Sequence, residues 1–303
     1  MAFTAKDVQA LREKTGCGMM DCKKALVETD GNIDAAIDYL REKGLAQQAK
    51  KADRIAAEGT VYAAVIDGVG VVVEINAETD FVANSDGFKA LAARVAGVIA
   101  KQAPADMDAL LACKEDGKTV EEMVQELFLK IRENIKVRRF VRYEGKVVTY
   151  VHAGGKIGVM VNFNTDLDAD NAGLVAMGKN VAMLIAAMNP AFLDEASVPA
   201  ETIEKEKEIL IAQMKEDPKM ANKPDAVLGK IVEGKIGKYY KENCLVEQAF
   251  VMDGDITVGK YVANTAKELG ADISIASFVR YEKGEGIEKR VDDFASEVAS
   301  MIK

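Results

Sequence analysis

The chain has 303 residues, a formal net charge of −9 at pH 7 and 49% hydrophobic residues, which is enough for two or more packed domains. The acidic balance argues against direct nucleic-acid binding, because a phosphate-binding groove needs a basic excess, and it favours a protein partner. No apolar run approaches the roughly 20 residues of a bilayer crossing and the N-terminus lacks a secretory signal, which predicts a cytoplasmic protein without a membrane segment.

Residues 1–45 are predicted to form a small bundle of three helices. Thr4 can cap the first helix, and residues 19–28 form the second. The third helix carries apolar side chains at spacings of four and three residues, namely Ile33, Ile37 and Leu40. Residues 46–57 are rich in Ala, Lys and Gln and have little apolar stripe, so they are interpreted as a linker with some helical character.

An internal repeat dominates the middle of the chain. Residues 58–104 align without a gap on residues 144–190, with about 17 of 47 positions identical. Each copy has two β-branched runs separated by a glycine-containing turn, followed by an amphipathic stripe. The repeat therefore predicts two units of the form β-β-α, which make up a duplicated, β-rich α+β core.

Further elements surround the repeat. Residues 120–134 resemble a helix, and the sequence FVRYE occurs at 140–144 and again at 278–282, which adds one strand to each half of the core. Two charged, helix-prone stretches, 201–217 and 224–242, predict an antiparallel helical hairpin, and apolar residues between 287 and 301 predict a C-terminal docking helix. The expected boundaries are 1–45 for the helical domain, 46–57 for the linker, 58–143 and 144–190 for the core units, 191–243 for the hairpin and 244–303 for the last core strand and the C-terminal module.

Enzyme motifs were considered and set aside. Gly68-Val69-Gly70 lies between two strands, whereas a dinucleotide fingerprint needs a strand, glycines and then a helix. The sequence Gly154-Gly155-Lys156 lacks the rest of a phosphate loop, so both motifs are interpreted as turns. His152 is the only histidine, and it and the four cysteines match no zinc pattern. We therefore expect no catalytic site, no metal and no disulfide.

The stretch NAETDFVANS, residues 76–85, lies where a strand of the first unit passes into a helix. Thr79-Asp80 recurs as Thr165-Asp166 in the second unit, which favours a shared capping role. Phe81 is replaced by Leu167, so only one unit carries the aromatic ring. Two interpretations stay open at this point: a buried Phe81 would fill the core, and an exposed Phe81 would be an interaction anchor.

Two long stretches, LREKTGCGMMDCKKAL at 11–26 and EINAETDFVA at 74–83, closely resemble the signatures of the bacterial elongation factor Ts family. The order of parts is similar over the whole chain, including GEGIEK at 284–289. The resemblance implies a ubiquitin-associated-like helical domain, a two-part core, a helical hairpin and a C-terminal module. It also implies a non-enzymatic, non-covalent function: exchange of guanine nucleotide on elongation factor Tu, with no cofactor bound by the factor itself.

The resemblance also implies contact residues. The segment that approaches the partner's nucleotide pocket and disturbs its magnesium ion corresponds to Thr79, Asp80, Phe81 and Val82. Other contacts correspond to Arg12, Met19, Met20, Lys23, Lys51, Ile131, His152, Val251 and Met252. One departure stands at Ile131-Arg132, where relatives have Ile-Gly. The hairpin is longer than in some relatives, so a homodimer through the core or the hairpin stays an open expectation.

A rival interpretation from another class is an acidic scaffold, in which the N-terminal domain binds a peptide or helix and the hairpin self-associates. An enzyme is a distant third. The scaffold and the exchange factor differ in one measurable property: only the exchange factor accelerates GDP release when it is present in catalytic amounts.

Overall fold

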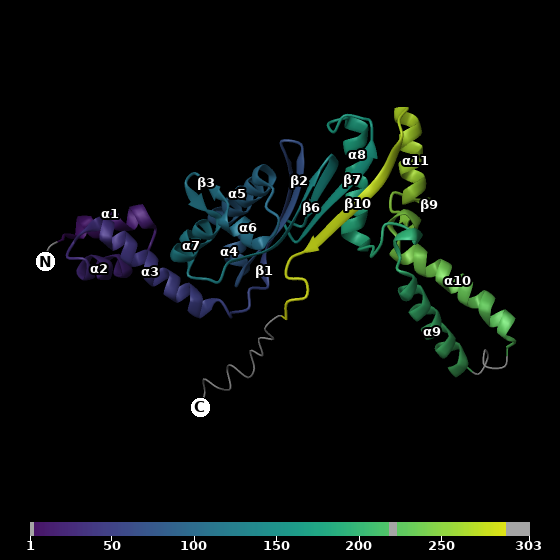
Figure 1. The fold of residues 1–303 in the computed structure, drawn as a ribbon, viewed down its shortest axis with the longest axis horizontal. Coiled ribbons are helices and arrows are strands. Elements are labelled where there is room, and N and C mark those ends of the chain that lie inside the picture. The colour runs from purple at the N-terminus through teal and green to yellow at the C-terminus, as the bar shows by residue number, and fades with distance from the viewer. Residues whose placement is uncertain (1–2, 218–222, 289–303) are drawn as a thin grey trace.

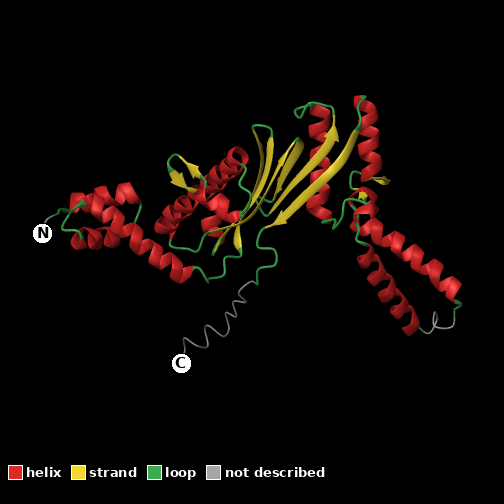
Figure 2. Cartoon of the chain, in the orientation of Figure 1, coloured by secondary structure: helices red, strands yellow, loops and turns green. Residues whose placement is uncertain are grey.

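The computed structural model describes residues 3–217 and 223–288, and it has the mixed α+β architecture that the sequence predicts. The described part is elongated, with a helical domain at one end, two sheets in the middle and a helical hairpin at the other end (Figure 1). The strands of both large sheets lie in the central region, and helices flank them on each side (Figure 2).

The N-terminal domain consists of α1 (Ala5–Thr15), α2 (Met19–Glu28) and α3 (Ile33–Lys51). Its core is a small cluster in which Leu11 and Leu26 are completely buried. The third helix is longer than predicted and includes half of the expected linker, because Ala, Lys and Gln are good helix formers and Leu129 packs against this domain. Only residues 52–57 remain as the connection to the first sheet, and they begin with a turn at 52–54.

The first sheet has the order β1-β2-β5 and is antiparallel throughout. Its strands are β1 (Glu58–Ile66), β2 (Val69–Ala77) and β5 (Lys136–Glu144). The elements packed around it are α4 (Asp80–Asn84), α5 (Asp86–Gln102), α6 (Met107–Ala112) and α7 (Val120–Ile131), with a small ribbon of β3 (Lys114–Glu115) and β4 (Lys118–Thr119). The hairpin, the long helix and the FVRYE strand were predicted, whereas α6 and the ribbon were not.

The second sheet has the order β6-β7-β10 and repeats this arrangement. Its elements are β6 (Lys146–His152), β7 (Ile157–Thr165), α8 (Ala172–Met188), α11 (Val258–Leu269) and β10 (Ile273–Glu282). The predicted helical hairpin is present as α9 (Ala200–Glu216) and α10 (Asp225–Asn243), and it leads to a short ribbon of β8 (Ala249–Phe250) and β9 (Asp253–Thr257). The expected C-terminal helix lies almost entirely outside the described residues.

The strand registers make the two sheets equivalent position by position. Pairing with β2 skips Arg138 of β5, and pairing with β7 skips Ala276 of β10, so each sheet has a bulge at the same place. On this basis Glu74 of β2 matches Asn162 of β7. The sheets contact each other through a cluster that contains two such matched pairs, Val61 with Val147 and Val72 with Met160.

The ungapped alignment of the repeat is therefore wrong within the second strand, where it placed Asn162 opposite Asn76. The turn between the hairpin strands has two residues in the first unit, 67–68, and four in the second, 153–156. After the second strand of each unit the difference in length is the opposite. Residues 78–84 lie between β2 and the helix cap Ser85, whereas only residues 166–170 lie between β7 and the equivalent cap Asn171. The first unit thus has two more residues at the strand-to-helix junction.

Candidate functional site

The short helix α4 occupies this longer junction and carries Phe81 at its surface. The side chain of Phe81 is 86% exposed, the highest value among the exposed large hydrophobic side chains. Its neighbours Val82 and Ala83 are buried in the core of the first unit. The core interpretation of Phe81 is therefore excluded, and the helix holds an aromatic ring in solvent at the cost of unfavourable hydration.

A set of hydrogen bonds fixes the start of α4 to the residues that follow α7. Glu133 accepts two hydrogen bonds from Thr79, one from the backbone N–H to Oε2 (3.0 Å) and one from the hydroxyl to Oε1 (2.7 Å). Glu78 in turn accepts the backbone N–H of Asn134 (2.7 Å). The backbone that leads into Phe81 is thus tied at two successive residues.

The predicted capping role of Thr79 is confirmed. Its Oγ1 accepts a hydrogen bond from the backbone N–H of Val82 at 3.4 Å, which satisfies a free amide at the start of the helix. In the second unit the hydroxyl of Thr165 accepts the N–H of Leu167 at 3.3 Å, although no helix begins there. The strand registers match Thr165 with Ala77, so the two threonines are not equivalent: the shared role is wrong, and the cap at Thr79 belongs, with α4, to the first unit alone.

Asp80, the first residue of α4, is exposed and borders a hollow of about 250 Å³. The hollow separates α4 from the turn between β6 and β7, and Lys156 and Lys283 also line it. His152 is exposed at the start of the same turn, where its Nδ1 lies 3.0 Å from the hydroxyl of Tyr150. The structure therefore places the α4 segment and the His152 turn on neighbouring parts of the core.

Six further predicted contact residues lie in two places, on the N-terminal domain and in the turn before β9, and Figure 1 shows α2 and β9 on opposite sides of α4. In the N-terminal domain Met19 and Met20 are 44% and 74% exposed at the start of α2, and Arg12 and Lys23 are exposed nearby. In the C-terminal part Val251 and Met252 are 58% and 62% exposed in the turn between β8 and β9. Exposed methionines of this kind suit adaptable protein contacts.

Three predicted contact residues point inward, and their side chains are not free surface. Val82 belongs to the core of the first unit, and Ile131 packs against that core. Lys51 donates a hydrogen bond from Nζ to the carbonyl of Arg132, and its ammonium lies 5.9 Å from the ring centre of Phe128. A contact between a partner and these three residues stays a prediction.

The departure at Arg132 has a visible consequence. Arg132 ends α7 with φ at +66°, a conformation that favours glycine, so a non-glycine residue is strained there. Its guanidinium forms an ion pair with Asp21 of α2 at 2.8 Å and a hydrogen bond with Gln47 of α3. The arginine therefore connects the N-terminal domain to the core, which glycine would not do.

Glu74 is the one buried acidic residue among the described residues, and it was not among the predicted site residues. Glu74 of β2 is completely buried and accepts hydrogen bonds from the guanidinium groups of Arg138 and Arg139 and from the backbone N–H of Gly284 (2.8 Å). Burial alone would raise the pKa of Glu74, but the Gly284 amide, the Asn76 amide and the two arginines outweigh it and hold the pKa below its ordinary value. A glutamate within the apolar run VVVEINA was the available signal.

The two glycine motifs lie in turns, as predicted: Gly68 joins β1 to β2 with φ at +81°, and Gly154 lies between β6 and β7 with φ at +64°. Across the described ranges, no three His, Cys, Asp or Glu side chains gather closely enough to hold a metal ion. None of the helices in the described part of the chain combines the length and apolar character that a bilayer crossing requires.

Comparison with known proteins addresses the family directly. The family described as Elongation factor TS matches residues 78–285. The protein Elongation factor Ts of Syntrophotalea carbinolica is 49% identical over 308 residues and covers 100% of both chains. Elongation factor Ts of Clostridium perfringens is 50% identical, with 99% of both chains covered, and that of Nitratiruptor sp. is 48% identical, with 100% covered.

The chain belongs to the elongation factor Ts family. It is a translation elongation factor with a nucleotide-exchange role in protein biosynthesis, and members of this family are exchange factors and not catalytic enzymes. Elongation factor Ts proteins act with elongation factor Tu, which makes the exposed residues above candidates for a protein interface.

The bonds from Thr79 to Glu133 lead to a testable expectation. Glu133→Ala frees the amide and hydroxyl of Thr79, so α4 loses its fixed orientation and the exchange rate is expected to fall several-fold. Thermal unfolding should change little, because Glu133 is only half-buried. Glu121→Ala, on the exposed side of α7, is the matched control. Unchanged exchange in Glu133→Ala would show that the orientation of α4 is set elsewhere.

Proposed function

We propose that this chain accelerates GDP release from elongation factor Tu by placing the ring of Phe81 against the partner's nucleotide site, where it disturbs the bound magnesium ion. One observation supports this most strongly: a phenylalanine that is 86% exposed on a helix whose first residues are hydrogen-bonded to the core. A ring so exposed loses most of its contact with water only in a complex. Its burial free energy therefore stabilises binding and not the folding of the free protein.

The physical basis is a coupling between two binding events on the partner. Magnesium neutralises the diphosphate oxygens, so a displacement of the ion weakens nucleotide binding. If this protein binds the nucleotide-free partner more tightly than the GDP-bound form, each ligand lowers the partner's affinity for the other. By linkage the two affinities fall by the same ratio. The factor then needs no covalent chemistry, and Asp80 beside the ring adds a negative charge near the ion's site.

The distant patches would supply docking affinity. Met19 and Met20 in the N-terminal domain and Val251 and Met252 in the C-terminal part offer apolar side chains at the two ends of the described chain. Arg12, Lys23 and His152 add polar contacts between and beside them. Several separate contacts raise the local concentration of α4 at the nucleotide site, which is the effect of multivalent binding.

The exchange function is tested by the release of fluorescent GDP from purified elongation factor Tu. Substoichiometric amounts of the chain should accelerate release of the whole bound pool, because each molecule acts repeatedly. Release limited to the molar amount of the chain, or binding without acceleration, would favour the acidic scaffold instead. Self-association through the core or hairpin is checked in the same samples by sedimentation.

A further inference from the structure

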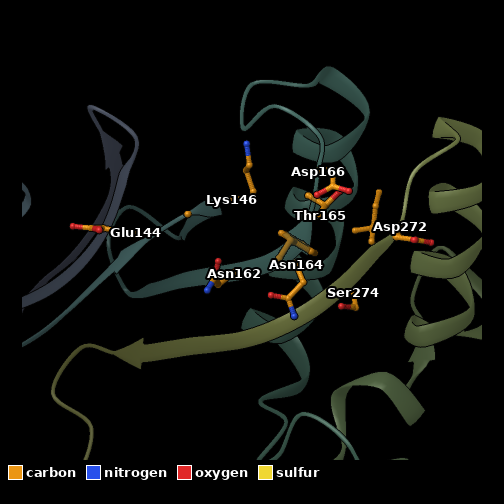
Figure 3. Close-up of a pocket in the computed structure, with 11 residues that line it drawn as sticks. Glu144, Lys146, Asn162, Asn164, Thr165, Asp166, Asp272 and Ser274 are labelled. Carbon is orange, nitrogen blue, oxygen red and sulfur yellow. The ribbon is translucent and has the colours of Figure 1, made fainter.

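A hollow of about 660 Å³ opens at one end of the strands of the second sheet, where β6 and β10 begin and β7 ends. Asn162, Asn164 and Ser274 line the sheet side of it, and Asp166 and Asp272 stand at its end (Figure 3). Thr165 pairs with Ile273, so these two aspartates flank the last strand pair. Neither asparagine side chain forms a hydrogen bond with another residue in the described part of the chain.

The matching place in the first sheet is covered. There Asn76 and Glu78 hold the positions of Asn164 and Asp166, as the strand registers show. Residues 52–57 lie over them: Asn134 donates from Nδ2 to the carbonyls of residues 52 and 54 (3.1 and 2.8 Å), and Arg54 forms an ion pair with Glu78 at 3.3 Å. A turn with one arginine, residues 52–54, therefore occupies the first site beside Asn134 and Glu78, and Gly284 covers Glu74, the counterpart of Asn162.

The chain path explains why the second site stays open. Residues 52–57 reach the first site because they lead into β1 from outside the sheet. The second unit has no such lead, since β5 ends at Glu144 and a single residue, Gly145, connects it to β6. Gly145 lies beside Asn162, because a Cβ built on it would be 3.4 Å from Oδ1 of that residue.

We propose that the hollow is a docking site for a short segment of a partner protein that carries a lysine or arginine opposite Asp166, as Arg54 lies opposite Glu78. The chemistry is complementary: Asp166 and Asp272 provide two carboxylates against the single cation of Lys146, while Glu144 forms an ion pair with Arg142 at 2.8 Å. Asp272 replaces the amide of Asn134 by a carboxylate, which strengthens the preference for a basic segment. The asparagines and Ser274 supply donors and acceptors for the backbone of that segment. This assignment does not depend on the exchange activity.

The segment that occupies the first site supplies a peptide probe for the hollow in the second sheet. A labelled peptide with the sequence of residues 50–58, KKADRIAAE, is titrated with the full-length chain and followed by fluorescence anisotropy. We expect saturable binding that weakens about tenfold or more in Asp166→Lys, because the ion pair is replaced by repulsion. A peptide with glutamate in place of its arginine should bind Asp166→Lys better than it binds the unaltered chain, a rescue that misfolding cannot produce.

Asp255→Lys makes the same charge change on β9, away from the hollow, and should leave peptide binding unaltered. Absence of saturable binding, or equal binding to Asp166→Lys, would overturn the proposal. A third arm compares the full chain with one that ends at residue 288. Peptide binding that occurs only in the shortened chain would assign the hollow to the chain's own C-terminal residues and would also overturn the partner assignment.

Discussion

Replacement of Phe81 by alanine is expected to reduce the acceleration of GDP release by roughly 30-fold or more, the loss typical of a central interface residue. The free energy of unfolding should change by less than about 0.5 kcal/mol, because the ring is 86% exposed and packs against little in the free chain. A buried phenylalanine would lose about 3–5 kcal/mol on the same change. Stability and exchange are therefore predicted to separate completely at this position.

Two controls accompany this variant. Val65→Ala truncates a side chain that is 44% exposed on β1, and both stability and exchange should be close to normal. Leu167→Ala truncates a half-buried side chain that packs against the core of the second unit, so stability should fall and exchange should change only through that loss. A Phe81→Ala protein that melts early yet exchanges normally while folded would mean that the ring serves packing in solution.

Glu74→Gln is expected to destabilise the protein by about 3 kcal/mol at pH 7. Removal of one member of a buried ion pair costs about 3–5 kcal/mol, and the lower end applies because Arg138 and Arg139 are 25% and 29% exposed. The two guanidinium groups would then face a neutral amide inside the protein. Chemical unfolding measures the change, and Glu126→Gln, in an exposed pair with Lys118, should alter stability by less than about 1 kcal/mol.

The effect of Glu74 should also depend on pH. Because the pKa of Glu74 is lower in the folded chain than its ordinary value of 4.5, its stabilisation is complete above about pH 4.5. It is lost as the pH falls through the lowered pKa of the folded state. The difference between the unaltered chain and Glu74→Gln is therefore expected to shrink in acid. A difference that stays constant from pH 7 to pH 3 would show that the carboxylate charge is not its source.

Local sequence patterns were sufficient to predict most of the fold. Alternation and turn glycines gave both hairpins, apolar spacing gave α5 and α8, and the repeated FVRYE gave β5 and β10. These elements are set by short-range preferences that each segment carries by itself. Among the elements that were missed, α6 and the β3-β4 and β8-β9 ribbons are short, whereas α11 has a clear amphipathic pattern, with Val258 and Val262 buried, that was available in the sequence.

The site needed the structure for a different reason. The turn of the second unit has two extra residues, and the strand-to-helix junction of the first unit also has two extra residues. The two insertions therefore cancel, and the repeat aligns without a gap. Phe81 and Leu167 then look equivalent, although only Phe81 belongs to a helix. Whether the ring was buried could not follow from its type or its neighbours, since exposure depends on which residues surround α4 in space.

The bond between Gly284 and Glu74 joins residues 210 positions apart. On a ribosome, the first sheet leaves the exit tunnel long before residue 284 is made, and during that interval the carboxylate of Glu74 lacks one of its donors. The β1-β2-β5 half is thus completed by the last part of the chain to be synthesised, together with the Arg138 and Arg139 contacts to residues 282–285. Contacts of such high sequence separation slow folding, so a ribosome-bound chain that lacks its final 25 residues should hold its first half in an unfinished, protease-sensitive form.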